Sequence, residues 1–493
     1  MDSIVADFSS KDFVRIIRKA TDLTDCRAYV VGEYVRDYFL RRKCKEISII
    51  VEGDAIELGQ QVGALIHSRV SCFRNSGVSM VDIKGDRITI SSAKKRVFDR
   101  NKREQVLIPG TIREYLKQRA FTIEAIAISL NEDDFGCLID EYGGVIDISR
   151  GIIRSAIHPN IVFKEHPVDM LRAIRFVAQL STSSLVFRIT PDCLKAIRES
   201  VEHIDSLSRE RIVEELNKML LCDTPSLAFS LLEEIGILKR IIPSLSKTSG
   251  VKKIAKVGHE DSFSHSLKVV NNIARLESRH IFNETNSLGI RHGNPNLWLR
   301  WAALLHEIGK PAVKKYTPEK GWTFHGYEVV GERMVPDVFL SLKMPQDEKM
   351  RYVQKLISLQ KRPMTLIDES TGESAYRRLL SDAGQDLDDL LLLCEANITT
   401  VNKAKADKAL SELELVRQKL AEVKEKEAIR NFKNPISANY IMELYGLEPC
   451  DTLGTLKDII KNAILSGEIG NNFEEADILL RKIAAEFGLI SLK

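Results

Sequence analysis

The stretch CKEISIIVEGD, residues 44–54, indicates the fold of the N-terminal part of the chain. Its run of isoleucine and valine predicts a strand, because β-branched residues favour that conformation. Side chains two residues apart in a strand share a face, so Glu46 and Ser48 project on the same side. Two acids in this arrangement hold a pair of magnesium ions. A serine at the second position leaves the expected carboxylate pair incomplete.

The residues around this strand predict an α/β domain. Upstream, VVGEYVRDYFL (residues 30–40) predicts a strand that enters a helix through Gly32, where backbone amides receive phosphates. Downstream, IELGQQVGALI (residues 56–66) predicts a helix. Further strands or strand edges are predicted for AYVVG (28–32), SMVDIKG (79–85), RITIS (87–91), FTIEAIAISL (121–130) and CLIDEYGGVIDI (137–148).

From about Pro167 onward the pattern becomes helical, with few strand signals. Helices are predicted for MLRAIRFVAQL (170–180), RIVEELNKMLL (211–221), SLAFSLLEEIGIL (226–238), HSLKVVNNIARL (265–276) and LWLRWAALLHEIG (297–309). Loops are expected at RHGNPN (291–296) and RPMTLIDESTGES (362–374). The apolar residues between Leu410 and Val423 follow helical spacing, which predicts an amphipathic helix packed on a neighbour.

Length and composition favour a multidomain globular protein. At about 150 residues per domain, the 493 residues correspond to roughly three units. Hydrophobic residues make up 44% and charged residues 29%, and the formal net charge is +3. The eight cysteines form no CxxC pair, which argues against a zinc site or a disulfide framework. With no run of about 18 apolar residues, the sequence predicts a cytoplasmic, non-membrane protein.

One segment concentrates positive charge. SSAKKRVFDRNKREQ (residues 91–105) carries six basic side chains against two acidic ones. The simplest prediction is a solvated loop, and the alternative is contact with an RNA backbone. The candidate RNA-binding residues are Lys94, Lys95, Arg96, Arg100, Lys102 and Arg103.

Several motifs in order resemble those of one family. GEYVRD (32–37) is similar to GGxVRD, and KEISIIVEGDAIEL (45–58) to (K/R)DIDLVVEGDxIEL. QRAFTIEA (118–125) is similar to RRDFTINA, and EHPVDMLRAIRF (165–176) to EDPxRxLRAIRF. With ERIVEELNKMLL (210–221) and the tail PISANYIMELYGL (435–447), they resemble the class II tRNA nucleotidyltransferase (CCA-adding enzyme) and poly(A) polymerase family, bacterial type with an HD domain.

The resemblance implies a fold and a domain order. It implies an α/β N-terminal nucleotidyltransferase head of the polymerase-beta-like type, followed by an all-α neck, an HD domain and a tail. The expected ranges are 1–152 for the head, 153–248 for the neck that binds RNA and nucleotide, 249–400 for the HD-like domain and 401–493 for the tail. The tail would help to hold the tRNA body, and Ser437 and Gly446 would bound one of its helices.

The departures from the family fall on the expected catalytic positions. Glu46 and Ser48 replace the two metal-binding aspartates, and Glu33 replaces the second glycine of the phosphate turn. Glu52 belongs to the VVEGD run, so it does not replace the missing acid. In the family, the Asp and Arg of EDxxR hydrogen-bond cytosine or adenine. Here His166 stands at the position of the Asp and Asp169 at the position of the Arg, so the acidic and basic ends are exchanged. The positions expected to bind nucleotide are Gly32, Glu33, Arg36, Arg119, His166, Asp169, Arg172 and Arg175.

The simpler interpretation of Asp169 and Arg172, three residues apart, is an ion pair on a helix surface. Ala120 and Gln118 replace the Asp and first Arg of RRDF.

The HD motifs are altered as well. HD-type phosphohydrolases gather histidines and aspartates around one or two metal ions. The resemblance implies metal positions at His265, His306, Glu307 and Asn397, with His325 and Tyr327 at a further motif. Glu307, Tyr327 and Asn397 each weaken such a site by length or charge, so loss of hydrolase activity is favoured over retention.

Four functions follow as hypotheses. The favoured one is a family member that binds tRNA or another structured RNA and has lost or altered nucleotidyl transfer. The others are an active CTP- and ATP-using tRNA nucleotidyltransferase with an atypical metal site, an HD-type metal-dependent phosphohydrolase, and an assembly protein without a nucleic-acid ligand. Mg²⁺ is expected only for an active enzyme. Expected partners are tRNA, ATP and CTP if nucleotide binding is retained, and a second copy or an active relative, with no membrane.

Overall fold

The computed structural model describes most of the chain in two compact units. The described residues are 2–44, 46–99, 104–250, 261–282, 296–319, 321–367, 372–430, 434–448, 450–465, 468–470 and 472–491. The first unit comprises Met1–Gln360 and Asp388–Val401, and the second comprises Lys361–Leu387 and Asn402–Lys493. Within the described residues, no helix has the length and apolarity needed to span a membrane. The domain boundaries at residues 152, 248 and 400 remain predictions.

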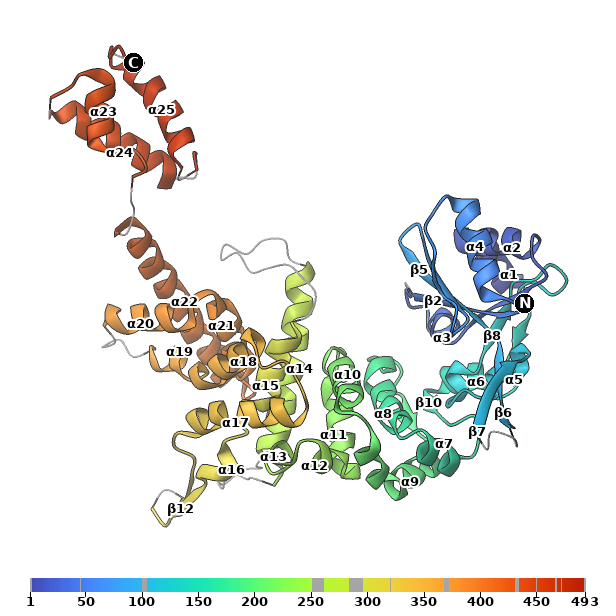
Figure 1. Cartoon of the computed structure of the whole chain (residues 1–493). Coiled ribbons are helices and arrows are strands. Elements are labelled where there is room, and N and C mark those ends of the chain that lie inside the picture. Colours follow the sequence, from blue (N-terminus) through green and yellow to red (C-terminus); the bar gives the residue numbers. More distant parts are fainter. Residues whose placement is uncertain are drawn as a thin grey trace. The chain divides into compact units, whose positions relative to one another are not determined.

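A mixed seven-stranded sheet forms the centre of the head (Figure 1). Its order is β3-β4-β5-β2-β1-β8-β9, with β2 and β5 parallel and the other neighbours antiparallel. The strands are β1 Arg27–Val31, β2 Glu46–Glu52, β3 Ser71–Phe73, β4 Val78–Ile83, β5 Asp86–Ser92, β8 Ala127–Ser129 and β9 Leu138–Ile139. The structure confirms the strands predicted at residues 28–32, 79–85 and 87–91 and within residues 44–54.

Helices cover both faces of this sheet. The head helices are α1 Asp2–Ser9, α2 Asp12–Thr21, α3 Glu33–Phe39, α4 Ala55–Ile66, α5 Ile112–Leu116 and α6 Gly144–Arg150. Helix α4 packs on β4 and β5 and helix α2 on β1, so these two helices lie on one face. On the other face, Ile112 and Leu116 of α5 pack with Val31 and Ile50 in an apolar cluster. This second face also carries Glu46, Ser48 and Glu52, because side chains alternate along β2.

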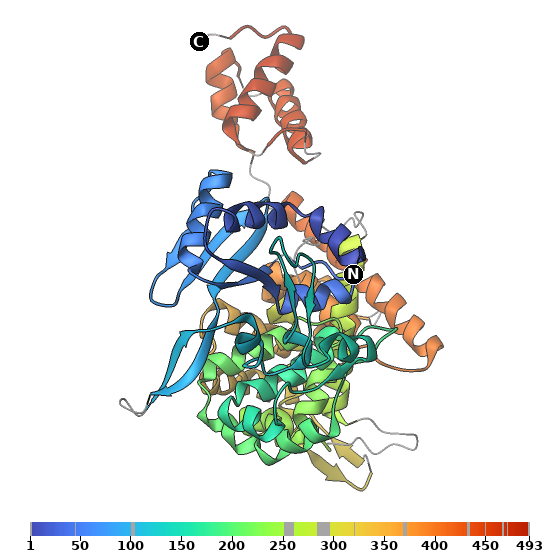
Figure 2. The same cartoon turned by 90° about the vertical axis from the view of Figure 1, so that its right-hand side faces the viewer.

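Three predictions for the head are wrong in part. The solvated loop predicted for residues 91–105 instead contains strands: β6 Lys94–Asp99 and β7 Glu104–Pro109 pair antiparallel as a separate two-stranded ribbon, which projects from the head (Figure 2). The second half of CLIDEYGGVIDI is helix α6, because the carboxylate of Asp140 accepts hydrogen bonds from the N–H groups of Gly144 and Val145. The first half of FTIEAIAISL is the 3₁₀ helix η1 Thr122–Glu124.

The neck consists of short helices, as predicted. They are α7 Pro159–Glu165, α8 Val168–Leu180, α9 Pro191–Glu199, η2 Val201–Ser206, α10 Arg209–Leu220, α11 Pro225–Ile235, α12 Ile237–Ile241 and α13 Pro243–Ser246. Gly236, with φ of 91°, divides the predicted helix at 226–238 into α11 and α12. The strands β10 Ile152–Ile153 and β11 Arg188–Ile189 pair in parallel beside them.

A second helical cluster completes the first unit. Its elements are α14 Ser262–Phe282, α15 Leu297–Leu305, α16 Lys310–Val313, β12 Lys315–Thr317, β13 Gly321–Thr323, α17 Tyr327–Ser341, α18 Glu348–Leu359 and α21 Leu387–Ala396. The helices predicted at 265–276 and 297–309 are confirmed as α14 and α15. The predicted loop RHGNPN lies outside the described residues except for Asn296, whose side chain caps α15.

The second unit is entirely helical. It contains α19 Arg362–Thr365, α20 Glu373–Ala383, η3 Gly384–Asp386, α22 Lys403–Arg430, α23 Ala438–Tyr445, α24 Asp451–Leu465 and α25 Phe473–Glu486. The predicted amphipathic helix is confirmed: Leu413, Val416, Leu420 and Val423 are buried on α22, which packs on α19 and α20. The prediction of a loop at residues 362–374 is wrong at its start, because α19 forms there. Residues 368–371 lie outside the described part of the chain. Ser437 and Gly446 bound α23 as predicted.

Candidate active site

Strand β2 places Glu46, Ser48 and Glu52 on one face. Glu46 is exposed and Ser48 is half-buried, next to Val31 at the end of β1. Glu52 accepts a 2.6 Å hydrogen bond from the backbone N–H of Ile112, the first residue of α5. Its carboxylate therefore stabilises a helix N-terminus instead of replacing the acid absent at Ser48.

These residues do not fit a two-magnesium site. Magnesium requires hard oxygen ligands in a near-ideal octahedron, and a serine hydroxyl supplies no negative charge. Among the described residues, Glu46 belongs to no group of three or more potential metal ligands.

The predicted phosphate turn lies directly beside Ser48. Gly32 follows β1 with φ of 68°, in the left-handed region that favours glycine, and precedes α3. Glu33 is the first residue of α3, and its carboxylate lies 3.7 Å from Nη1 of Arg36. The helix N-terminus that would attract a phosphate thus already carries a negative charge.

Arg36 is fully buried and surrounded by acids. Its Nε lies 2.8 Å from Asp37, and its Nη1 lies 3.8 Å from the buried carboxylate of Glu124. Burial works against the charged guanidinium, but the neighbouring carboxylates outweigh this effect and raise the pKa of Arg36. Arg36 is therefore a buried cation held near three carboxylates, and its Nη1 has no hydrogen-bond partner among the described atoms.

Glu124 also binds the next predicted arginine. Arg172 of α8 donates to Glu124 over 3.1 Å and to Asp169 over 2.9 Å, so η1 and α8 are joined through charge. Burial opposes the charge of Arg172, but the carboxylates of Glu124 and Asp169 overcome it and raise the pKa of Arg172. The predicted ion pair between Asp169 and Arg172 is confirmed, but its predicted place on the helix surface is wrong, because Asp169 is buried. Glu124 extends the pair into a network.

The two remaining arginines have different surroundings. Arg175 is buried, 2.7 Å from Glu215 of α10, and also contacts Gln179. Arg119 lies over the ring of Tyr115 at 4.7 Å and hydrogen-bonds the Tyr115 hydroxyl. Its Nη2 would be 3.8 Å from a Cβ at Gly32, which places Arg119 beside the phosphate turn.

A cavity of about 410 Å³ opens next to Arg119. Its lining residues lie on β6, on α5 and the segment that follows α5, on α7, and at the start of α8. The lining residues are Lys95, Glu114, Lys117, Gln118, Arg119, Ala120, Ile157, Val162, Glu165, His166 and Asp169. The structure thus brings Arg119, His166 and Asp169 together, whereas Arg175 does not line this cavity.

The basic ribbon is only partly described. Lys94 donates to the carbonyl of Ser76 at 2.5 Å, and Lys95 forms a 2.7 Å ion pair with Glu114. Arg96 lies in β6, and Arg100, Lys102 and Arg103 lie outside the described residues.

A second polar centre lies among the helices around α15. His265, His306 and Glu307 place potential ligand atoms within 4.8 Å of one another. Asn397 joins them, because its Oδ1 lies 2.7 Å from Nε2 of His265, and the hydroxyl of Thr399 lies 3.1 Å from the other ring nitrogen. His325 is exposed and does not belong to this group within the described part of the chain.

Two atoms of this centre, Nε2 of His306 and Oε2 of Glu307, are suited to ligate a metal ion. His306 donates from Nδ1 to the carbonyl of Ala303, so the lone pair on its Nε2 faces the centre. This Nε2 and Oε2 of Glu307 are buried without a hydrogen-bond partner among the described atoms. Burial lowers the pKa of His306 to about 4, which keeps the imidazole neutral, the form that ligates a metal. The ammonium of Lys310 contacts Oε1 of Glu307 and offsets part of its charge.

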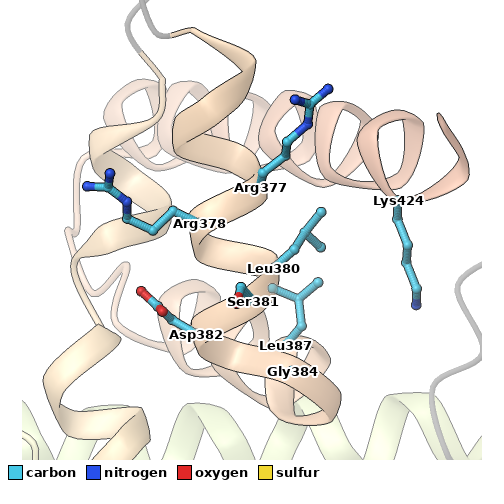
Figure 3. A pocket seen from close by; sticks show the side chains of 8 residues that line it. All are labelled: Arg377, Arg378, Leu380, Ser381, Asp382, Gly384, Leu387 and Lys424. Atoms are coloured by element: carbon cyan, nitrogen blue, oxygen red, sulfur yellow. The ribbon is translucent and has the colours of Figure 1, made fainter. Parts of the chain in front are cut away.

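The second unit has a larger cavity, of about 720 Å³, between α20, η3 and α22 (Figure 3). Figure 3 shows Leu380 and Leu387 side by side, with Lys424 on the neighbouring helix. Arg377 and Arg378 point in different directions, so the guanidinium groups do not converge on a shared position.

Comparisons with known proteins agree with this arrangement. Residues 28–154 match the Poly A polymerase head domain, residues 186–248 match the probable RNA and SrmB-binding site of polymerase A, and residues 262–390 match the HD domain. The chain therefore carries regions similar to the head, RNA-binding and HD domains of poly(A) polymerases, and it is similar to CCA-adding proteins. The predicted fold class is confirmed.

Individual relatives match part of the chain. The Multifunctional CCA protein of Verminephrobacter eiseniae is 33% identical over 241 residues, which cover 48% of this chain and 52% of that protein. The chain therefore spans about half the length of this relative. The A-adding tRNA nucleotidyltransferase of Deinococcus radiodurans is 26% identical, over 77% of this chain and 81% of that protein.

Solved structures of the family share the fold. The Thermotoga maritima CCA-adding enzyme complexed with tRNA superposes with a TM-score of 0.56 at 19% identity, over 99% of this chain and 98% of that chain.

Two residues at these sites were missed by the sequence analysis. Glu124 occupies the place of the family's Asn in the FTINA motif, so its departure was visible in QRAFTIEA, although its two arginine partners were not. Lys310 follows Glu307 by three residues, a spacing that brings side chains together on one turn of helix.

Proposed function

We propose that this chain binds tRNA, or another structured RNA, through the family scaffold and does not transfer nucleotides by the two-metal mechanism. The observation that carries the proposal is the face of β2. In the family motif, Ser48 aligns with the second metal-binding aspartate, and Glu52, the acid of that face besides Glu46, is engaged at the N-terminus of α5.

The arginines support loss of transfer as well. An arginine that stabilises a triphosphate must present its charge to the ligand. Arg36 and Arg172 instead direct theirs to Glu124, with Asp37 and Asp169 as further partners. Transferring a nucleotide would require breaking this buried network, which costs several kcal/mol when one charge is left unpaired.

RNA binding rests on the scaffold. The family's RNA-binding region matches residues 186–248, and a relative with bound tRNA shares the fold over nearly the whole chain. Double-stranded RNA is recognised by shape and backbone charge, so binding does not need the catalytic carboxylates.

The test combines binding and transfer in one preparation of the full chain. A tRNA lacking its 3′ end is incubated with labelled CTP and ATP and with Mg²⁺ or Mn²⁺, and its binding is measured over a salt series. We expect binding that weakens as salt rises, without incorporation of label. Incorporation that disappears in the Glu46→Ala variant would overturn the loss of transfer, and absence of salt-sensitive binding would favour an assembly protein.

A second function, metal-dependent phosphohydrolysis, is favoured by the two unsatisfied atoms at the HD centre. His306 and Glu307 would hold the ion, and His265 would join them by exchanging its hydrogen bond to Asn397 for the metal. The ion would supply a bound water for attack on a phosphoester. The test is metal analysis of the purified chain and of His306→Ala. We expect near-stoichiometric transition metal in the first and a loss of about tenfold or more in affinity in the second. Equal, negligible metal content in both would remove this function.

A further inference from the structure

The hairpin of β12 and β13 carries a pair of aromatic rings on one face. Tyr316 and Trp322 stand directly opposite each other in its register, and their ring centroids lie 5.1 Å apart in an edge-to-face arrangement. Opposed residues of an antiparallel pair project from the same side. The hairpin projects from the helical cluster beyond α16 (Figure 1), and Tyr316 is 58% exposed.

A lysine completes this face. Lys314, the residue before β12, places its Nζ 4.2 Å from the ring centroid of Trp322. An ammonium in this position is attracted by the negative face of the indole. Neither Lys314 nor the exposed Lys315 forms an ion pair with another described residue, so both charges are available to an anion. The described part of the hairpin carries one acid, Glu319, in its turn.

The exposure of Tyr316 fits a nucleobase better than a protein partner. Cross-strand packing explains why the two rings meet, but it leaves most of the Tyr316 side chain in water. A stable protein interface buries about 800 Å² on each partner, and one exposed ring covers little of this. A single base covers one ring, and bases of any kind stack on aromatic side chains. The phosphates that flank the base would meet the lysines.

Both ends of the hairpin are anchored beside the HD centre. Lys310, at the start of α16, contacts Glu307, and its Nζ lies 5.6 Å from the ring centroid of Phe324, the residue after β13. One buried lysine thus lies against both ends of the hairpin. A stacking surface held in this way loses less conformational freedom on binding than a mobile one.

We propose that Tyr316 stacks on one unpaired base of a single-stranded RNA segment and that Lys314 contacts a neighbouring phosphate. Trp322 has a positioning role, because it supports the Tyr316 ring and holds the Lys314 ammonium. Bases inside a duplex are paired and stacked on one another, so duplex RNA offers none to this ring. The inference rests on the proposed function in that the ligand is RNA, and it adds a single-stranded element to be recognised.

The experiment measures RNA binding to the full chain by fluorescence anisotropy. The probe is a labelled single strand of about eight adenosines, and a blunt duplex of the same strand length is compared with it. We expect Tyr316→Ile to weaken binding of the single strand by about tenfold and to leave duplex binding unchanged. Isoleucine suits a strand but has no ring. Tyr316→Phe keeps the ring and should keep the affinity.

Two control variants are matched to the assigned residues. Phe73→Ile removes a ring that is 51% exposed on β3 of the head. Lys314→Gln is compared with Lys349→Gln, because the Nζ of Lys349 lies 5.5 Å from the ring centroid of Trp298. We expect Lys314→Gln to weaken single-strand binding and reduce its salt dependence, and both controls to keep the original affinity.

Several results would overturn the inference. They are no affinity for the single strand, equal affinities of Tyr316→Ile and Tyr316→Phe, a loss in Phe73→Ile as large as in Tyr316→Ile, and an equal loss of duplex binding in Tyr316→Ile. The last two would show an effect of folding or of general surface change instead of stacking.

Failure of this inference is distinguishable from failure of the proposed function. A chain that binds tRNA, but whose affinity for the single strand does not depend on Tyr316, contradicts only the inference. A chain that binds the single strand through Tyr316 but binds no tRNA contradicts only the proposed function.

Discussion

At the scale of single residues, the site is governed by buried charge. Glu124 is 3% exposed and lies between Arg36 and Arg172. A buried ion pair adds little net stability, but removing one partner leaves an uncompensated charge in a medium that solvates it poorly. Arg36 and Arg172, two of the arginines that the sequence motifs assign to nucleotide binding, therefore share Glu124 as a buried partner whose removal should destabilise the head.

Replacing Glu124 by Gln keeps the volume and removes the charge. We expect the free energy of unfolding of the head to fall by about 2–4 kcal/mol, measured by urea denaturation. Glu214→Gln is the control, because its partner Lys218 is on the surface, and it should change stability by less than about 0.5 kcal/mol. Equal effects of the two changes would show that the network is not a stabilising unit.

The cysteines offer a second prediction at this scale. Burial raises the pKa of Cys222 to about 12, whereas Cys450 is exposed. Because the thiolate is the reactive form, iodoacetamide at pH 8 should label Cys450 within minutes and leave Cys222 unlabelled in the folded chain. Mass spectrometry of the digested protein measures both sites. Comparable labelling of Cys222 under native conditions would contradict its burial.

At the scale of elements, the sequence predicted those whose pattern is local. The β-branched run of β2 and the apolar residues of α4 and α8 were sufficient, because the signal for each element lies within its own segment. Helix α6 was missed, although the sequence contains its boundary signals: Gly143 before it, Gly151 after it, and Asp140 near its start. In the structure both glycines have positive φ, and Asp140 accepts a hydrogen bond from the N–H of Gly144. The strand β6 was missed because basic residues dominate its sequence. The Asp169–Arg172 pair within α8 was predictable from its spacing, but the rest of the charge network was not, because Arg36 and Glu124 come from α3 and η1.

The contact between α4 and β4 yields a prediction. A Cβ at Gly59 would lie 2.5 Å from Cβ of Ser79, which is closer than packed carbon atoms approach. Gly59→Ala should therefore destabilise the head by about 1–3 kcal/mol in urea denaturation. The matched control is Gly454→Ala in α24, where a Cβ meets no described atom within 4 Å and helix propensity should raise stability by about 0.5–1 kcal/mol. Changes of the same sign would contradict this packing.

The basic segment at residues 91–105 makes a prediction about RNA. Replacing both Lys102 and Arg103 by Glu should weaken tRNA binding by about tenfold or more at moderate salt and reduce the salt dependence, because each phosphate contact releases counterions. The control replaces the exposed Lys11 and Lys19 by Glu, which changes the net charge by the same amount. Filter binding over a salt series measures both variants. If the two variants lose affinity equally, net charge explains the effect and this segment does not contact RNA.

At the scale of the whole molecule, the two candidate centres differ. In the head, the family motif aligns Ser48 with a metal-binding aspartate, and Arg36 and Arg172 lie in ion pairs. The HD centre keeps a neutral histidine and a carboxylate oxygen without a hydrogen-bond partner among the described atoms. Both centres lie in parts of the chain that match the head and HD domain models. These observations support our proposal of an RNA-binding protein that does not transfer nucleotides.

The most direct test is a single-turnover extension assay, with the purified chain in excess over a tRNA that lacks its 3′ end. CTP, ATP, Mg²⁺ and Mn²⁺ are supplied, and tRNA length and the bound fraction are followed together for hours. We predict that most of the tRNA is bound and that its length does not change. Growth of the bound tRNA by one or more nucleotides, abolished in Glu46→Ala, would contradict the account.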